Sequence, residues 1–307
     1  MNWNPNALPD LSGQVHAVTG STGGIGYFAA EQLASAGAEV VLVSRSEERM
    51  QHTQEVLRSH VPGASVRSVR LDLTSLDSVA AAGAALAELP RLDGVFLNGG
   101  PMNFSTRART HDGLPLMVGA HMIANAALAM ALLPRLARQD LGHSARIVHA
   151  STGFVTRFGM SVTDLEKTPR TGVGAYTKAK TATEVFAHEL DRRLRAAGLP
   201  VSSIITRPGV GVDAKTPSRQ GISGDGVRRR RNPFTPWAQG KDAAAWSGVR
   251  ALSDPDAEGG DYFAPREGMR GAPVLVASDP RTRTPEPGVA QRVWGRVLEL
   301  SGVHAVV

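Results

Sequence analysis

Tyr176 and Lys180 have the residue types and the spacing that acid–base chemistry needs. Residues four apart on a helix lie on one face, about one turn from each other. A neighbouring ammonium group stabilises phenolate, which lowers the tyrosine pKa toward the range of a working general acid or base. The hydroxyl residues Ser151 and Thr152 end the predicted strand that precedes this helix. We therefore predict a site in which Tyr176 acts as a general acid or base.

A glycine-rich turn, Thr19–Gly26, follows the first predicted strand and opens a helix. Its glycines permit a tight turn and the close approach of a pyrophosphate, which the helix N-terminus attracts with free N–H groups and its dipole. This position, first in the chain and between a strand and a helix, favours a nucleotide site over a plain tight turn. The residues expected to bind the cofactor here are Gly20, Ser21, Thr22, Gly24, Ile25 and Gly26.

The second predicted strand ends in Ser44, and Arg45 follows. Folds that bind NAD normally place a carboxylate at this strand end, about 20 residues after the glycine turn, where it binds the ribose hydroxyls. A carboxylate would repel the 2′-phosphate of NADP, whereas a guanidinium group can pair with it and stack on adenine. The sequence therefore predicts NADP(H) as the cofactor. The alternative is that Arg45 is a surface residue without a role.

The elements that must position these residues alternate along the first two thirds of the chain. Short β-branched runs are followed by longer Ala- and Leu-rich segments of helical period, a pattern typical of βαβ units. We predict an α/β fold, a single Rossmann-type doubly wound parallel sheet of about seven strands with helices on both faces. The predicted strands are 15–19, 39–44, 65–71, 94–98, 145–151, 201–206 and 273–277. The predicted helices are 25–36, 47–59, 76–88, 116–138, 173–197 and 241–252.

No internal repeat and no linker divides the chain before about residue 208, so we interpret residues 1–307 as one domain. Residues 209–235 are rich in Gly, Pro, Arg and Ser, which predicts a long, mobile loop; the family resemblance described below implies that it is a variable loop at the substrate site. Residues 254–307 form a C-terminal extension. The loop contains Arg228–Arg231, which we interpret as a solvated charge run in preference to a specific anion site.

The composition excludes several classes of protein. Of the 307 residues, 42% are hydrophobic and 20% are charged, with a net charge of +6, which fits a folded core and excludes a disordered or fibrous chain. The absence of Cys excludes disulfides, thiolate metal sites and cysteine nucleophiles. The N-terminus lacks the pattern of a secretory signal. The most apolar stretch, 114–133, contains His121 and Asn125, so we expect a buried helix and no transmembrane segment. Because the chain has no Cys and no secretory signal, we expect a cytoplasmic location.

Together these motifs resemble those of the short-chain dehydrogenase/reductase family over most of the chain. The retinol-dehydrogenase-like branch is the most similar, because Thr110–Gly113 precedes the central helix and a long insert separates Thr152 from Tyr176. The tail resembles this branch as well, in 261–265, in 270–271 and in a last helix with Trp294. The resemblance assigns further cofactor contacts to Asp72 and Leu73 beside the adenine, to Asn98, Gly99 and Gly100, and to Pro208 and Gly209 beside the nicotinamide, and it adds Tyr176 and Lys180.

The resemblance implies hydride transfer that interconverts an alcohol with a ketone or aldehyde. Tyr176 would protonate or deprotonate the substrate oxygen, Thr152 or Ser151 would hydrogen-bond it, and Lys180 would lower the Tyr176 pKa and bind the nicotinamide ribose. The chain departs from the family at Thr152, where the family has Ser, and at Gly99, where it has Ala. His121 falls where the family has the Asn that holds a proton-relay water. Its imidazole could relay protons or fill the core as a neutral side chain.

Two other classes of function compete with this interpretation. A chain with an altered set of catalytic residues could be an NADP(H)-binding sensor or scaffold, and intact Tyr176 and Lys180 argue against that. A protein that binds nucleic acid or a membrane surface through Arg228–Arg231 would show salt-dependent binding. We expect a small-molecule carbonyl or alcohol substrate and no nucleic acid, and a homo-oligomer is possible.

Arg45→Ala tests the choice of cofactor. The substitution should weaken NADPH binding and leave NADH binding nearly unchanged, because only the contact with the 2′-phosphate is lost. Fluorescence titration of both nucleotides measures this. Equal losses for both, or tighter NADH binding by the unaltered protein, would contradict the expected preference for NADP(H).

Overall fold

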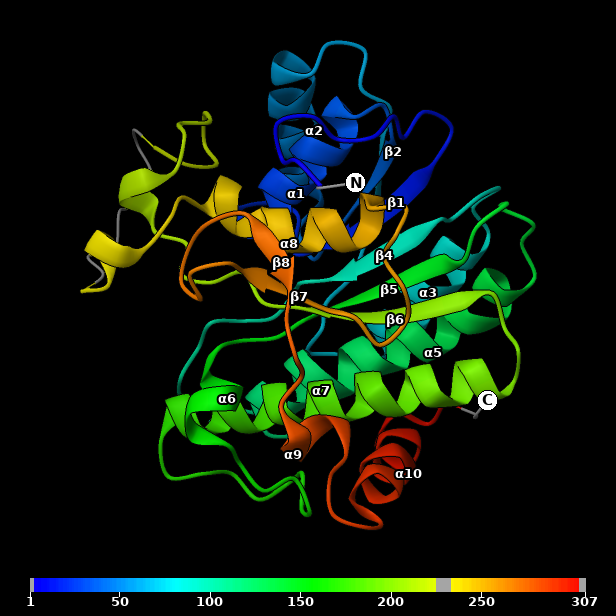
Figure 1. Cartoon of the computed structure of the whole chain (residues 1–307), viewed down its shortest axis with the longest axis vertical. Helices are drawn as coiled ribbons and strands as arrows, with labels where there is room; N and C mark the ends of the chain where they lie inside the picture. The colour runs from blue at the N-terminus through cyan, green and yellow to red at the C-terminus, as the bar shows by residue number, and fades with distance from the viewer. Residues whose placement is uncertain (1–2, 225–232, 304–307) are drawn as a thin grey trace.

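Eight strands form one sheet in the order β3-β2-β1-β4-β5-β6-β7-β8 in a computed structural model (Figure 1), whose described residues are 3–224 and 233–303. The inner strands are rich in Val and Ile and are buried along most of their length, as strands covered on both faces must be. The strands are β1 (Val15–Thr19), β2 (Glu39–Ser44), β3 (Val66–Arg70), β4 (Gly94–Leu97), β5 (Ala145–Ala150), β6 (Val201–Thr206), β7 (Tyr262–Pro265) and β8 (Pro273–Leu275).

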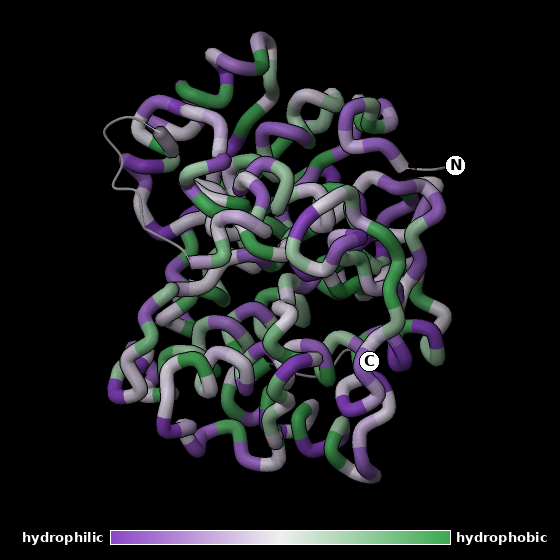
Figure 2. Tube along the Cα trace, turned by 60° about the vertical axis from the view of Figure 1, so that its left-hand side comes forward, coloured by the Kyte–Doolittle hydropathy of each residue, from purple (hydrophilic) through white to green (hydrophobic). Residues whose placement is uncertain are grey.

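Helices cover both faces of this sheet. One buried cluster joins the sheet to α1, α2 and α8, and a second joins it to α3, α5, α7 and α10 (Figure 1). Hydrophobic and hydrophilic residues alternate along the outer helices (Figure 2), as expected where one side of each helix is buried. The helices are α1 (Gly24–Ser35), α2 (Glu47–His60), α3 (Leu76–Ala87), α4 (Leu116–Val118), α5 (Ala124–Ala137), α6 (Phe154–Phe158), α7 (Gly172–Ala196), α8 (Lys241–Ser253), α9 (Pro280–Arg283) and α10 (Val289–Ser301), with short turns η1 (Gly119–Ile123), η2 (Asp213–Lys215) and η3 (Thr235–Trp237).

The doubly wound fold is confirmed, and the strand count and the direction of the last strand need correction. The sheet has eight strands instead of about seven, because β7 went unrecognised in the sequence. β7 has four residues and ends in proline, so its pattern is too short to identify. The strand predicted at 273–277 is β8, which is antiparallel to β7 and forms the sheet edge. β1 lies between β2 and β4, which is the point where strand order reverses and ligands bind in such folds.

The helix predicted at 116–138 is interrupted at η1, which is a single π-helical turn. The Asn125 side chain donates hydrogen bonds to the carbonyls of Ala120 (2.9 Å) and His121 (3.3 Å) in this turn and to that of Gly99 (3.2 Å). The stretch Leu116–Ala137 is long and apolar enough to cross a membrane, yet 94% of its most apolar window is buried inside the fold. It is the buried central helix that the sequence predicted.

The C-terminal segments close the fold around α7. Trp294 of α10 is buried and stacks on Phe186 of α7, with ring centroids 5.3 Å apart, while the Arg193 guanidinium lies 4.3 Å from the indole centroid. The segment after β6 is tied to α1, since Arg219 forms a two-pronged ion pair with Glu31. Arg228–Arg231 lie outside the described residues.

Candidate active site

The end of β5 and the first turns of α7 bring the predicted catalytic side chains together. α7 begins at Gly172 because the Thr171 hydroxyl accepts a hydrogen bond from the Gly174 amide (3.1 Å), a typical N-cap. The Lys180 ammonium donates to the Ala150 carbonyl at 2.6 Å. The Thr152 hydroxyl is hydrogen-bonded to the Tyr176 phenol. Thr152, Tyr176 and Lys180 therefore meet at the carboxyl end of β5.

Ser151 has a different partner from its neighbour Thr152. Its hydroxyl is buried and donates to the Glu184 carboxylate, one turn beyond Lys180 on α7. Of the two hydroxyls that the sequence offered for the substrate oxygen, the structure therefore leaves Thr152 beside Tyr176. The sequence could not separate them because β5 ends at Ala150, and beyond the strand end no alternation fixes which way each side chain points.

Burial is the largest cause of the pKa shifts of Tyr176 and Lys180. It raises the pKa of Tyr176 to about 12, and the hydrogen bond with Thr152 opposes the rise. It lowers the pKa of Lys180 to about 8, and the Glu184 charge opposes that fall. The ammonium lies 5.9 Å from the Tyr176 ring centroid and is engaged with Ala150. The lowering of the Tyr176 pKa that the spacing predicted is therefore absent in this arrangement of the protein alone.

His121 lies in η1 and packs edge-on against Tyr176, with ring centroids 5.3 Å apart. Its side chain is 3% exposed, and its Nε2 is 3.0 Å from the Pro101 carbonyl.

Burial, and then the nearby Lys180 charge, lower the pKa of His121 to about 3. The imidazole is neutral above that pH, so Nε2 donates to Pro101 and Nδ1 is left as a buried acceptor without a partner.

The glycine turn has the close packing that its sequence predicted. Gly20 has a φ of +69°, and a Cβ on Gly26 would overlap the Gly20 carbonyl, so helix α1 can begin directly over the turn only with glycine there. The Ser21 hydroxyl accepts a hydrogen bond from the Val43 amide (3.0 Å), which fixes the turn to β2. The Asn98 side chain donates to the Thr19 carbonyl (3.1 Å) and fixes it to β4.

A cavity of about 210 Å³ opens beside this turn. It brings together Ser44 and Arg45 after β2, Asp72 and Leu73 after β3, and residues 99–101 after β4, as the sequence predicted. The Arg45 side chain is exposed at its rim. Arg49, one turn later on α2, donates to the Thr22 carbonyl (3.0 Å) and adds a second guanidinium group beside the turn. The lining residues are Gly20, Val43, Ser44, Arg45, Leu71, Asp72, Leu73, Thr74, Gly99, Gly100 and Pro101.

Pro208 and Gly209 leave the end of β6, outside this cavity. Gly209 has a φ of +69°, and a Cβ there would overlap the Met269 carbonyl. The buried Gln239 side chain donates to the Pro208 carbonyl (2.9 Å) and accepts from the Gly271 amide (2.9 Å). This glutamine ties together the segments after β6 and β7, and no motif in the sequence marks it.

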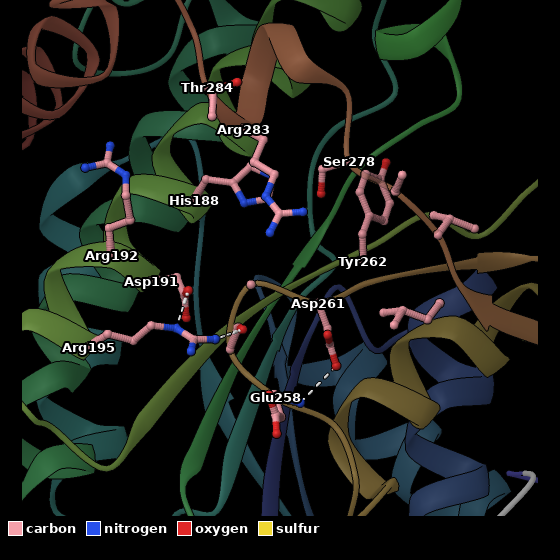
Figure 3. Close-up of a pocket in the computed structure, with 15 residues that line it drawn as sticks. His188, Asp191, Arg192, Arg195, Glu258, Asp261, Tyr262, Ser278, Arg283 and Thr284 are labelled. Carbon is pink, nitrogen blue, oxygen red and sulfur yellow. Dashed lines mark hydrogen bonds and ion pairs between the residues drawn. The ribbon is translucent and has the colours of Figure 1, made fainter.

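A larger cavity of about 660 Å³ lies between the C-terminal part of α7 and the segments around β7 and β8 (Figure 3). Charged residues from α7, among them Asp191, Arg192 and Arg195, face Glu258 and Asp261 across it. None of the residues that the sequence predicted for catalysis or cofactor binding lines this cavity. Size alone would therefore place the site away from Tyr176.

The sequence reasoning missed three residues that support the site: Arg49, Asn125 and Glu184. Glu184 carried a detectable signal, because it lies four residues after Lys180 on the same helix, whereas Arg45 precedes α2 and gives no helical spacing for Arg49. Asn125 carried none, since its bonds depend on the π-helical turn.

Gly100→Ala tests the contact between the cofactor turn and His121. A Cβ on Gly100 would overlap the imidazole, which is buried and cannot move aside, so the free energy of unfolding should fall by about 2 kcal/mol. The loss should largely disappear when His121→Ala is the background, because the two residues are in contact. Gly153→Ala, where a Cβ meets nothing within 4 Å, is the matched control. Urea denaturation of the four variants and the unaltered chain measures this, and an equal loss in both backgrounds would contradict the contact.

Comparison with known proteins agrees with this geometry. The family model described as short chain dehydrogenase matches residues 14–221. Polyprenol dehydrogenase of Mus musculus is 30% identical over 309 residues, covering 98% of this chain and 88% of that protein. The crystal structure of an uncharacterized protein from Mycobacterium Paratuberculosis has a TM-score of 0.77 at 24% identity and covers 100% of both chains. L-sorbose reductase from Gluconobacter frateurii, complexed with NADPH and L-sorbose, has a TM-score of 0.62 at 19% identity, over 84% of this chain and 97% of that one. The chain belongs to the short-chain dehydrogenase/reductase family, and its relatives support the retinol-dehydrogenase-like branch.

Proposed function

We propose that this oxidoreductase interconverts an alcohol with a ketone or aldehyde, with NADP(H) as its cofactor and Tyr176 as general acid and base. The observation that carries the proposal is the meeting of Thr152, Tyr176 and Lys180 at the end of β5, with the glycine turn after β1 at the same edge of the sheet. In open α/β sheets, ligands bind at this carboxyl edge, at the point where strand order reverses.

The residues around the cavity after β1 fit NADP(H). Gly20 and Gly26 leave room for a pyrophosphate at the start of α1, where a Cβ on either residue would overlap its neighbours. No acidic residue ends β2, and the exposed Arg45 guanidinium stands where a 2′-phosphate would be received. The NADPH complex of the structurally similar L-sorbose reductase agrees with this choice. When bound, the cofactor supplies or accepts the hydride, which is chemistry that no side chain can provide.

Three side chains then transfer the proton and stabilise the reacting oxygen. In the reducing direction, the Tyr176 hydroxyl gives its proton to the substrate oxygen, and it takes a proton back in the oxidising direction. The Thr152 hydroxyl hydrogen-bonds the same oxygen, while the positive charge of Lys180 favours the tyrosinate that forms. Bound cofactor and substrate also exclude water from this end of the sheet.

An apolar substrate fits the residues around this edge. Phe104 packs edge-on against Tyr176, with centroids 6.1 Å apart, and is still 42% exposed. Met102 and Trp237 are 55% and 59% exposed and follow β4 and β6 in the chain. Exposed apolar side chains near a site indicate an apolar ligand. The similarity to polyprenol dehydrogenase supports the same class of substrate.

Tyr176→Phe tests the reaction. The purified chain should oxidise NADPH in the presence of apolar aldehydes or ketones, and the variant should lose about 100-fold or more in kcat because it lacks the proton donor. NADPH affinity should stay close to that of the unaltered chain. If the unaltered chain binds NADPH and turns over no carbonyl in a panel of chain lengths, it is a cofactor-binding sensor or scaffold instead.

His121→Leu separates the two roles that the sequence left open for this residue. Because burial keeps the imidazole neutral above about pH 3, we expect the pH profile of kcat between pH 5 and pH 9 to keep its shape in this variant. His121→Asn, which restores the residue type typical of the family, is the companion variant. A shifted profile in His121→Leu, with a normal one in His121→Asn, would show that the imidazole relays protons.

A further inference from the structure

Glu184 is a carboxylate buried in the middle of α7, with only 1% of the residue exposed. Ser151 and the Tyr262 hydroxyl (2.8 Å) both donate to its Oε1, and Thr282 donates to Oε2 at 2.9 Å. These three hydroxyls come from the end of β5, from β7 and from α9. An ionised carboxylate accepts hydrogen bonds and has none to donate, so three hydroxyl donors match its charged form.

Three successive residues of β5 and the segment after it contact three residues of α7 that are spaced one turn apart. Thr152 bonds Tyr176, the carbonyl of residue 150 accepts from Lys180, and Ser151 bonds Glu184. Tyr176, Lys180 and Glu184 share one face of the helix because they are four residues apart. Glu184 is thus the last of three contacts that set the strand end against the catalytic face.

We propose that Glu184 is a positioning residue for the reaction: its carboxylate sets a negative charge one helix turn from the Lys180 ammonium and, through Ser151, holds the end of β5 against Tyr176 and Lys180. This inference rests on the proposed function. It also gives the C-terminal extension a part in the reaction, because Tyr262 and Thr282 hold the carboxylate from the other side.

The titratable groups that face Lys180 come from three elements. Besides Tyr176 and Glu184 on α7, they are His121 of η1 and His149 of β5. Burial lowers the pKa of each histidine to about 3, with the Lys180 charge as a second cause, so both are neutral. Among the described residues, Glu184 is therefore the group whose negative charge favours the ammonium form of Lys180.

Glu184 itself faces Tyr262 of β7 and two charged residues of α9, Asp279 and Arg281. Burial raises the pKa of Glu184, the hydrogen bonds from the three hydroxyls oppose that rise, and Asp279 adds to it. Arg281 pairs with Asp279, so the two charges largely cancel. The hydroxyls are then the groups that keep the carboxylate ionised.

Coulomb's law gives the direction in which the Lys180 pKa changes when the Glu184 charge is removed. Burial lowers the pKa of Lys180 to about 8 even with the carboxylate in place. Removing the negative charge lowers this pKa further, so the ammonium loses its proton at a lower pH. We expect a shift of about two pH units, the size that a single charge about 6 Å away, one helix turn along, produces at an effective dielectric constant of about 20.

Glu184→Gln removes the negative charge of this side chain and keeps its length and shape. Glutamine has the same length, and its carbonyl oxygen can accept from both Ser151 and Tyr262, as Oε1 does. Thr282 also lies 3.0 Å from the Asp279 carbonyl, so its hydroxyl can donate there and accept from the amide. Glu189→Gln is the matched control, because Glu189 is a buried carboxylate of the same helix that pairs with Arg192 and Arg193.

The pKa of Lys180 can be read directly by NMR with carbon-13 at lysine Cε, because the chain has five lysines: Lys167, Lys178, Lys180, Lys215 and Lys241. Loss of one signal in Lys180→Gln assigns it. We expect the Lys180 midpoint to fall by about two pH units in Glu184→Gln, to stay at the value of the unaltered chain in Glu189→Gln, and to recover in Glu184→Asp. The alkaline limb of kcat should move down by the same amount in Glu184→Gln.

An unchanged Lys180 midpoint in folded Glu184→Gln would overturn the inference, whether or not the chain turns over a carbonyl. A shifted midpoint in a chain without turnover would refute the proposed function and leave the electrostatic coupling intact. If Glu184→Gln does not fold, Glu184→Met replaces it, because methionine has a similar length and lacks the negative charge. The Lys180 midpoint should move in the same direction, and no movement there would equally overturn the inference.

Discussion

Burying the ammonium group of Lys180 costs free energy unless the group is hydrogen-bonded, and the Ala150 carbonyl at the end of β5 supplies that bond. The rest of the site depends on this contact. The contact fixes α7 against the end of β5, which sets Tyr176 beside Thr152. It also holds the Lys180 ammonium close to the Tyr176 ring. This 25-residue helix is held in register by the buried Lys180 ammonium and by that of Lys178, which donates to two carbonyls of the segment before α7, together with the neighbouring hydroxyl contacts.

The cofactor side of the site depends on close backbone contact. The turn after β1 lies under α1 only because Gly20 and Gly26 leave no Cβ between them. The Val43 amide of β2, which donates to the Ser21 hydroxyl, and the Asn98 side chain just after β4, which donates to the Thr19 carbonyl, hold the same turn in place. Gly100 and His121 extend this packing to the central helix, so the turn, the π-helical segment and Tyr176 form one continuous contact.

The C-terminal extension belongs to the same structure. β7 and α9 reach α7 through Tyr262 and Thr282, and α10 covers the far side of this helix with Trp294. These segments pack against the helix that carries Tyr176, so they influence the site without contributing a predicted catalytic group. Burial is the largest cause of the pKa shifts around the site, because it lowers the pKa values of both Lys180 and His121.

The sequence by itself determined the α/β fold, the glycine turn and the pairing of Tyr176 with Lys180, because these depend on local spacing along strands and helices. Arg45, predicted from the end of the second strand, and Asp72, which the family resemblance assigned, line one cavity in the structure, since parallel strands end at the same edge. Only the tertiary structure decided that Ser151 turns to Glu184, that His121 is neutral, that the central helix contains a π-helical turn and that β7 joins the sheet. Each of these depends on burial or on a contact between residues far apart in the chain, and periodicity carries no record of such contacts.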